Sequence, residues 1–193
     1  MTGPLIAVFG SSQALPGDGL YEEAVRCGDL LARSGFGVVT GGYGGVMEAA
    51  ARGARLRGAR AIGVTVPSVF PDRPGANEFV SDEMPTTHLM ERIHALTDLT
   101  EAWIAMPGSL GTLAELAIAW NLAFVARYSA TPPKPLVTVG EVWAALVDHL
   151  AGSVGADRSL VITARDVDEA VAAVVRLIPG RAHPGTTAAP GRS

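Results

Sequence analysis

Short apolar runs alternate with longer stretches of helical periodicity along the first third of the chain. The runs 5–12, 36–42 and 59–67 are short and rich in Val, Ile and Phe, which is typical of buried strands. In the stretches 19–35 and 45–58, apolar residues recur near the spacing of one helix face. The order strand, helix, strand, helix, strand, with short connections, predicts a parallel sheet with helices on both faces.

The same alternation continues through the rest of the chain. It predicts helices at 87–99, 112–127, 141–151 and 167–178, and strands at 101–108, within 131–140 and at 159–165. We therefore predict an α/β fold, a single-domain, doubly wound, Rossmann-like parallel sheet over residues 1–180. The Pro-, Gly- and Thr-rich end, residues 181–193, is predicted to be a disordered tail.

Residues 68–86 show neither the apolar run of a buried strand nor the apolar spacing of a helix. The segment holds Pro71, Pro74, Gly75 and Pro85 and is predicted to be one long loop. Long loops within compact domains often serve function, so we expect this one to contribute ligand contacts.

Composition restricts the possible classes of protein. The 193 residues are 48% hydrophobic with a mean hydropathy of +0.29. No apolar run approaches the ~20 residues of a membrane-spanning helix, whereas strands buried on both faces would explain the apolarity. The net charge is −4, and the arginines at 52, 55, 57 and 60 read as a solvated helix face, so we expect neither nucleic-acid nor membrane partners. The first residues lack the pattern of a signal peptide, and the single cysteine, Cys27, allows no internal disulfide, so we expect a cytoplasmic protein.

Three predicted strands end in glycine-rich turns that lead into helices, at 9–12, 40–48 and 106–115. In open parallel sheets, ligands bind beyond the carboxyl ends of the strands, where all three turns would lie. Glycine allows close approach of the backbone, and the unpaired N–H groups of a following helix attract anions. Such turns also occur where a helix and a strand merely pack closely. The dinucleotide-binding fingerprint and the ATPase P-loop are both absent from these turns.

The third turn, "MPGSLGTLAE", carries the most specific signal. Thr112 is expected near the N-cap of the following helix, with Glu115 three residues later. This spacing fits a capping box, in which the two side chains only satisfy backbone groups. It also fits a functional arrangement, with Glu115 beside a phosphate-binding turn and with Arg92 on the preceding predicted helix.

These motifs resemble the LOG (LONELY GUY) family of cytokinin riboside 5′-monophosphate phosphoribohydrolases, formerly mislabelled as lysine decarboxylases. The resemblance spans about residues 5–150 and rests on a PGGxGTxxE-like pattern, the arginine-bearing helix and the GGxxGxM-like turn. It implies a catalytic pair, Arg92 and Glu115, no metal or organic cofactor, and a homodimer. The phosphate- or nucleotide-binding residues that it and the glycine turns predict are Gly10, Ser11, Ser12, Gly41, Gly42, Gly44, Gly45, Met47, Pro107, Gly108, Ser109, Leu110, Gly111 and Thr112.

The implied reaction is hydrolysis of the N-glycosidic bond of a nucleoside 5′-monophosphate such as AMP, which releases the free base and ribose 5-phosphate. Glu115 would stabilise the positive anomeric carbon or activate water. Arg92 would hold a phosphate or ribose hydroxyl, or orient Glu115. The candidates for a second carboxylate are Glu48, Asp82 and Glu83.

A non-catalytic function stays open as the alternative. Ser109 replaces the second glycine of the family pattern, and Ile93 stands where the family commonly has lysine. Molybdenum-cofactor carriers and other nucleotide binders share similar glycine turns. We do not expect lysine decarboxylation, because a pyridoxal-phosphate enzyme needs a Schiff-base lysine and the one lysine, Lys134, is predicted at the opposite edge of the sheet.

Overall fold

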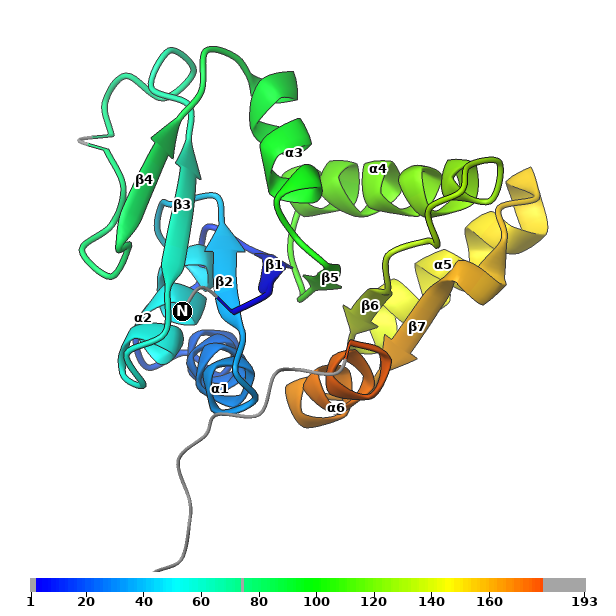
Figure 1. Ribbon diagram of the computed structural model, residues 1–193, viewed down its shortest axis with the longest axis horizontal. Helices are drawn as coiled ribbons and strands as arrows, with labels where there is room; N and C mark the ends of the chain where they lie inside the picture. The colour runs from blue at the N-terminus through cyan, green and yellow to red at the C-terminus, as the bar shows by residue number, and fades with distance from the viewer. Residues whose placement is uncertain (1–2, 74, 179–193) are drawn as a thin grey trace, which may run out of the picture.

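The computed structural model describes residues 3–73 and 75–178, which form one parallel β-sheet with helices on both faces (Figure 1). The strand order is β4-β3-β2-β1-β5-β6-β7. The strands are β1 (Leu5–Phe9), β2 (Gly37–Thr40), β3 (Ala61–Thr65), β4 (Asp82–Pro85), β5 (Ala102–Ala105), β6 (Leu136–Val139) and β7 (Val161–Ala164). The predicted Rossmann-like α/β class is confirmed. The predicted tail, 181–193, and the last two residues of the predicted domain lie outside the described residues.

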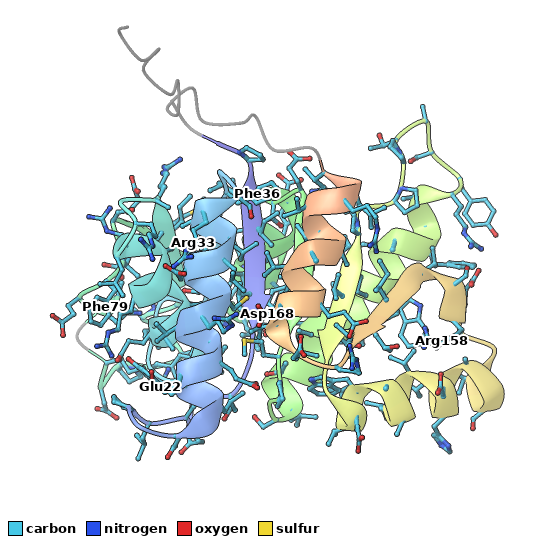
Figure 2. All side chains as sticks on the ribbon, turned by 90° about the horizontal axis from the view of Figure 1, so that it is seen from below. Glu22, Arg33, Phe36, Phe79, Arg158 and Asp168 are labelled. Atoms are coloured by element: carbon cyan, nitrogen blue, oxygen red, sulfur yellow. The ribbon has the colours of Figure 1, made fainter. Side chains whose placement is uncertain are left out.

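Two hydrophobic cores lie on opposite faces of the sheet. Helices α1 (Gly19–Arg33), α2 (Val46–Arg55) and α6 (Val167–Leu177) contribute to one core. Helices α3 (Leu89–Asp98), α4 (Leu110–Ala126) and α5 (Glu141–Val154) contribute to the other. Figure 2 shows α1 and α6 side by side, and an ion pair between Arg26 and Asp168 joins them.

Strand β1 lies where the strand order reverses. It pairs in parallel with β2 on one side, Ile6 opposite Val38, and with β5 on the other, Ile6 opposite Ala102. Because every strand pair is parallel, the carboxyl ends of the central strands share one edge. The turns after β1, β2 and β5 therefore meet at the switch point, where ligands of such sheets bind.

The prediction of one long loop at 68–86 is wrong, because the segment contains β4. Its sequence, Asp-Glu-Met-Pro, has no apolar run, and all four residues are exposed. The strand lies at the sheet edge and pairs only with β3, with Val64 opposite Met84. An edge strand tolerates proline and need not be apolar. The two usual signals of a strand, an apolar run and the absence of proline, were therefore both missing from this segment.

None of the helices within the described residues has the length and apolarity needed to span a membrane.

Candidate functional site

A pocket with a cavity volume of about 180 Å³ lies at the switch point. Backbone hydrogen bonds join the three turns around it: Ser11 N–H donates to the Pro107 carbonyl at 3.1 Å, and Val46 N–H donates to the Ser11 carbonyl at 2.8 Å. The pocket is lined by Val8, Phe9, Gly10, Ser12, Gly41, Tyr43, Met47, Phe70, Arg73, Arg92, Ser109, Gly111, Thr112 and Glu115.

Glycine is required at two positions of the second turn. A Cβ atom on Gly41 would lie 1.6 Å from Nη2 of Arg92, so any side chain there would displace the guanidinium. Gly45 has φ of +72°, and a Cβ on it would lie 2.3 Å from the Ser11 carbonyl oxygen. Gly41 therefore leaves room for the Arg92 guanidinium, and Gly45 lets the turn after β2 approach the turn after β1.

Arg92 reaches the pocket from α3 and is almost fully buried. Its Nε donates a hydrogen bond to the Val64 carbonyl at 2.9 Å, and Nη2 lies 3.6 Å from the sulfur of Met47. Burial lowers the pKa of Arg92, and the charge of Glu115 opposes that change. An arginine starts from so high a pKa that it stays charged at neutral pH.

Glu115 projects from α4 toward this guanidinium. Its Oε1 lies 3.5 Å from Nη1 of Arg92, with 12% of the Glu115 side chain and 9% of the Arg92 side chain exposed. Burial raises the pKa of Glu115 to about 7, although the positive charge of Arg92 opposes the rise. The carboxyl group can therefore hold or release a proton near neutral pH, as a general acid or base requires.

The capping-box interpretation of Thr112 and Glu115 is wrong. Helix α4 begins at Leu110, with Ser109 as its N-cap, so Glu115 lies in the second turn and faces the pocket. The Ser109 side chain makes no capping hydrogen bond. The first N–H groups of a helix have no intrahelical partner, and a Cβ on Gly111 would meet nothing within 4 Å. This end of α4 is open to an anion.

The structure brings together part of the predicted site. Arg92 and Glu115 line the pocket with Gly10, Ser12, Gly41, Met47, Ser109, Gly111 and Thr112. The other predicted residues, Ser11, Gly42, Gly44, Gly45, Pro107, Gly108 and Leu110, are in the same turns but not in its lining. They shape the backbone instead; for example, a Cβ on Gly108 would lie 2.2 Å from Oγ1 of Thr112.

Sequence reasoning missed five lining residues, Val8, Phe9, Tyr43, Phe70 and Arg73. Tyr43 stands inside the glycine turn, and its hydroxyl accepts a hydrogen bond from Val66 N–H at 2.9 Å. Phe70 and Arg73 come from the 68–86 segment. The sequence predicted ligand contacts from this segment but did not indicate which of its residues would make them. The available signal was one aromatic and one basic side chain in that segment.

None of the candidates for a second carboxylate lines the pocket. Glu48 accepts a hydrogen bond from the Tyr21 hydroxyl at 2.6 Å, Asp82 pairs with Arg60, and Glu83 accepts from the Thr65 hydroxyl at 2.7 Å. Glu115 is the one carboxyl group among the lining residues.

Lys134 lies at the opposite edge of the sheet, just before β6. Its ammonium group donates to the carbonyls of Thr97 and Asp98, each at 3.0 Å, at the end of α3. The predicted position of Lys134, away from the glycine turns, is therefore confirmed. Within residues 3–73 and 75–178, no three His, Cys, Asp or Glu side chains gather in an arrangement able to hold a metal ion.

The sheet, its switch point and the pocket define a Rossmann-like α/β protein with a buried Arg–Glu pair beside an open helix N terminus. The chain belongs to the SLOG cluster4 family, a LOG-like family, which it matches over residues 4–125.

Curated relatives include both uncharacterized and named proteins. An uncharacterized protein of Archaeoglobus fulgidus is 34% identical over 51% of this chain and 63% of its own length. A cytokinin riboside 5′-monophosphate phosphoribohydrolase of Mycobacterium tuberculosis is 34% identical over 62% of each chain. One of Rhodococcoides fascians is 29% identical over 83% of this chain and 85% of its own length. The chain thus spans somewhat less than two thirds of the first two relatives.

Solved structures share the fold over nearly the whole chain. The molybdenum cofactor binding protein of Rippkaea orientalis has a TM-score of 0.70 and 25% identity, with 92% of this chain and 98% of that chain covered. The molybdenum cofactor carrier protein of Chlamydomonas reinhardtii has a TM-score of 0.69 and 29% identity, with 90% and 96% covered.

Proposed function

We propose that the protein hydrolyses the N-glycosidic bond of a nucleoside 5′-monophosphate, such as AMP or a cytokinin riboside monophosphate, and releases the base and ribose 5-phosphate. The observation that carries the proposal is the position of Glu115, whose pKa is about 7, 3.5 Å from Arg92 and one turn beyond an open helix N terminus. The names of the Mycobacterium tuberculosis and Rhodococcoides fascians relatives support it.

The phosphate binds at the N terminus of α4. The N–H groups of the first helical turn and the positive end of the helix dipole both favour an anion there. Ser109 and Thr112 line the pocket from this end of α4, and Ser12 lines it from the turn after β1. With the phosphate held at this end, the ribose extends toward Glu115, one helical turn away.

Glu115 then acts on the anomeric carbon. As a carboxylate it stabilises the positive charge that develops at C1′ and accepts a proton from the attacking water. The base leaves with the electron pair of the C1′–N bond and takes a proton from solvent. Arg92 holds the Glu115 carboxylate in place and contributes a cation for ribose or phosphate oxygens.

The direct test is to incubate the protein with AMP and quantify adenine and ribose 5-phosphate by chromatography. We expect Glu115→Gln to lower the rate by roughly 10²–10⁴, the usual contribution of one general acid or base. Glu101→Gln is the matched control, because Glu101 is an exposed carboxylate beside the start of β5, at the opposite edge. Equal rates for Glu115→Gln and wild type would show that the assignment is wrong.

A second candidate is a non-catalytic nucleotide- or molybdenum-cofactor-binding protein. It is favoured by the two solved structures with that description and by Ser109 and Ile93, the two departures from the LOG pattern. Ile93 is buried and does not line the pocket, so no lysine charge is supplied from that position. A thermal shift with AMP in the absence of any product would favour this candidate over the hydrolase.

We also propose a homodimer, with α4 in the interface. A helix that is apolar on nearly all sides is normally buried, yet α4 exposes Leu122 (42%), Phe124 (40%) and Val125 (50%). A groove lined by Trp120, Phe124 and Leu150 runs beside them. We expect light scattering to give twice the mass of one chain, and Val125→Arg to give a monomer; a monomeric wild type would refute the dimer.

A further inference from the structure

The charged and aromatic side chains of the pocket contact one another in a fixed order. Glu115, on α4, lies 3.5 Å from Arg92, and the guanidinium carbon of Arg92 lies 6.0 Å from the ring centre of Tyr43. Arg73 packs on the same ring, with its guanidinium carbon 4.5 Å from the ring centre. The pocket therefore has an α4 end and a loop end, with the Arg92–Glu115 pair between them.

Arg73 is held at the loop end by aromatic rings. Its guanidinium carbon lies 4.3 Å from the ring centre of Phe70, and the rings of Phe70 and Tyr43 meet edge to face at 5.4 Å. No ion pair or side-chain hydrogen bond within residues 3–73 and 75–178 involves this guanidinium. Its five N–H donors are therefore open to a ligand in the pocket that it lines.

The segment that carries Arg73 is fastened to the glycine turn after β2. Asn77 N–H donates to the Gly42 carbonyl at 2.7 Å, and the Asn77 side-chain amide donates to the Tyr43 carbonyl at 2.8 Å. After β3, Val66 N–H donates a hydrogen bond to the Tyr43 hydroxyl. These contacts hold the Tyr43 ring on which Arg73 packs, so little conformational entropy of the ring is lost when a ligand contacts it.

We propose that Arg73 recognises the base of the ligand and makes the site bind 6-oxopurine nucleoside 5′-monophosphates more tightly than 6-aminopurine ones, so that AMP, a substrate in the proposed function, is the weaker ligand. The inference rests on the proposed function in one respect, since it takes the ligand to be a nucleotide with its phosphate at the α4 end. The order of contacts then directs the base past Glu115 and Arg92 to Tyr43, Phe70 and Arg73.

Hydrogen-bond chemistry gives the preference its direction. Guanine and hypoxanthine carry two adjacent acceptors, O6 and N7, which a guanidinium contacts with two parallel N–H groups. Adenine has N7 but places an amino donor at position 6, and arginine has donors only. One good bidentate contact of this kind discriminates between bases by roughly 5- to 150-fold.

The test measures binding by calorimetry with GMP, AMP and ribose 5-phosphate. Every protein in the test is the full chain carrying Glu115→Gln, so that the nucleotides stay intact. This variant is measured by itself and in combination with Arg73→Gln, Arg73→Lys or Arg52→Gln. Arg52 is the matched control, since its guanidinium also lies over a ring, 5.8 Å from that of Phe79, outside the pocket. We expect GMP to bind about tenfold or more tightly than AMP, and Arg73→Gln to bring the two within about twofold.

Three further results decide the inference. Unchanged binding of ribose 5-phosphate by Arg73→Gln would support base recognition, whereas an equal loss for all three ligands would overturn it in favour of a general anion contact. Arg73→Lys keeps the charge but loses the planar pair of donors, so we expect it to lose most of the discrimination. Tighter binding of AMP than of GMP would also overturn the inference.

The proposed hydrolysis is tested separately, with the wild-type chain. If no nucleotide is cleaved but the GMP preference and its dependence on Arg73 hold, the hydrolase proposal fails and base recognition stands. If cleavage occurs with no preference between GMP and AMP, base recognition fails alone.

Discussion

Replacement of Glu115 by glutamine should stabilise the protein while it lowers the proposed activity by roughly 10²–10⁴. Burial raises the pKa of Glu115 from the ordinary 4.5 to about 7. At 1.36 kcal/mol per pKa unit, this difference makes the ionised carboxylate cost the folded state about 3 kcal/mol relative to the protonated one. Glutamine resembles the protonated acid in shape and charge, so the variant avoids that cost.

The sign of the pH dependence follows from the raised pKa. Below about pH 4.5 Glu115 is protonated in both the folded and the unfolded chain, so wild type and Glu115→Gln should be equally stable. As pH rises toward 7 the unfolded chain loses the proton first, and the wild type loses stability relative to the variant. The difference reaches its full value of about 3 kcal/mol above pH 7 and then stays constant.

Urea unfolding of both proteins between pH 4.5 and 8.5 measures this difference directly. Titrating groups that the two proteins share affect both equally and cancel in the comparison. A gap between Glu115→Gln and wild type that does not change with pH would refute the burial argument, because it would mean that Glu115 titrates alike in both states.

Three other outcomes follow from the geometry. If Glu115 acts as a carboxylate, kcat/KM should rise about tenfold per pH unit on the acid side and level off near pH 7; a flat profile between pH 5 and 8 would contradict that role. Gly41→Ala should lower nucleotide hydrolysis at least about 10²-fold, because the new Cβ would lie 1.6 Å from the Arg92 guanidinium, while the circular dichroism spectrum stays unchanged. Gly19→Ala is the control, because nothing lies within 4 Å of its new Cβ. Trp143→Phe should destabilise the fold by about 1–3 kcal/mol in urea unfolding, since the Met106 carbonyl loses its buried hydrogen bond from the indole at 2.9 Å; an unchanged midpoint would show that water replaces the donor.

The pattern of apolar residues along the chain was sufficient to predict most of the strands and helices of the fold. The strands that became β1, β2, β3 and β5 are apolar runs buried on both faces, and periodicity of this kind is a local property of sequence. Strand β4 escaped prediction because it lies at the edge, where exposure removes the need for apolar residues. The glycine turns were also readable, since a strand that ends in glycine before a helix is itself a local pattern.

The chemistry of the pocket was decided by contacts between distant segments. Sequence placed Arg92 and Glu115 on consecutive helices, but only the arrangement of α3 and α4 on one face of the sheet brings them to 3.5 Å and buries the carboxyl group enough to raise its pKa. The local signal for Arg73 was weak, a basic side chain three residues after an aromatic one, because its proposed function depends on the ring of Tyr43, which the fold brings to it from a distant segment. Local sequence determines where strands, helices and turns form, whereas desolvation and charge interactions depend on which of those elements the tertiary structure places side by side.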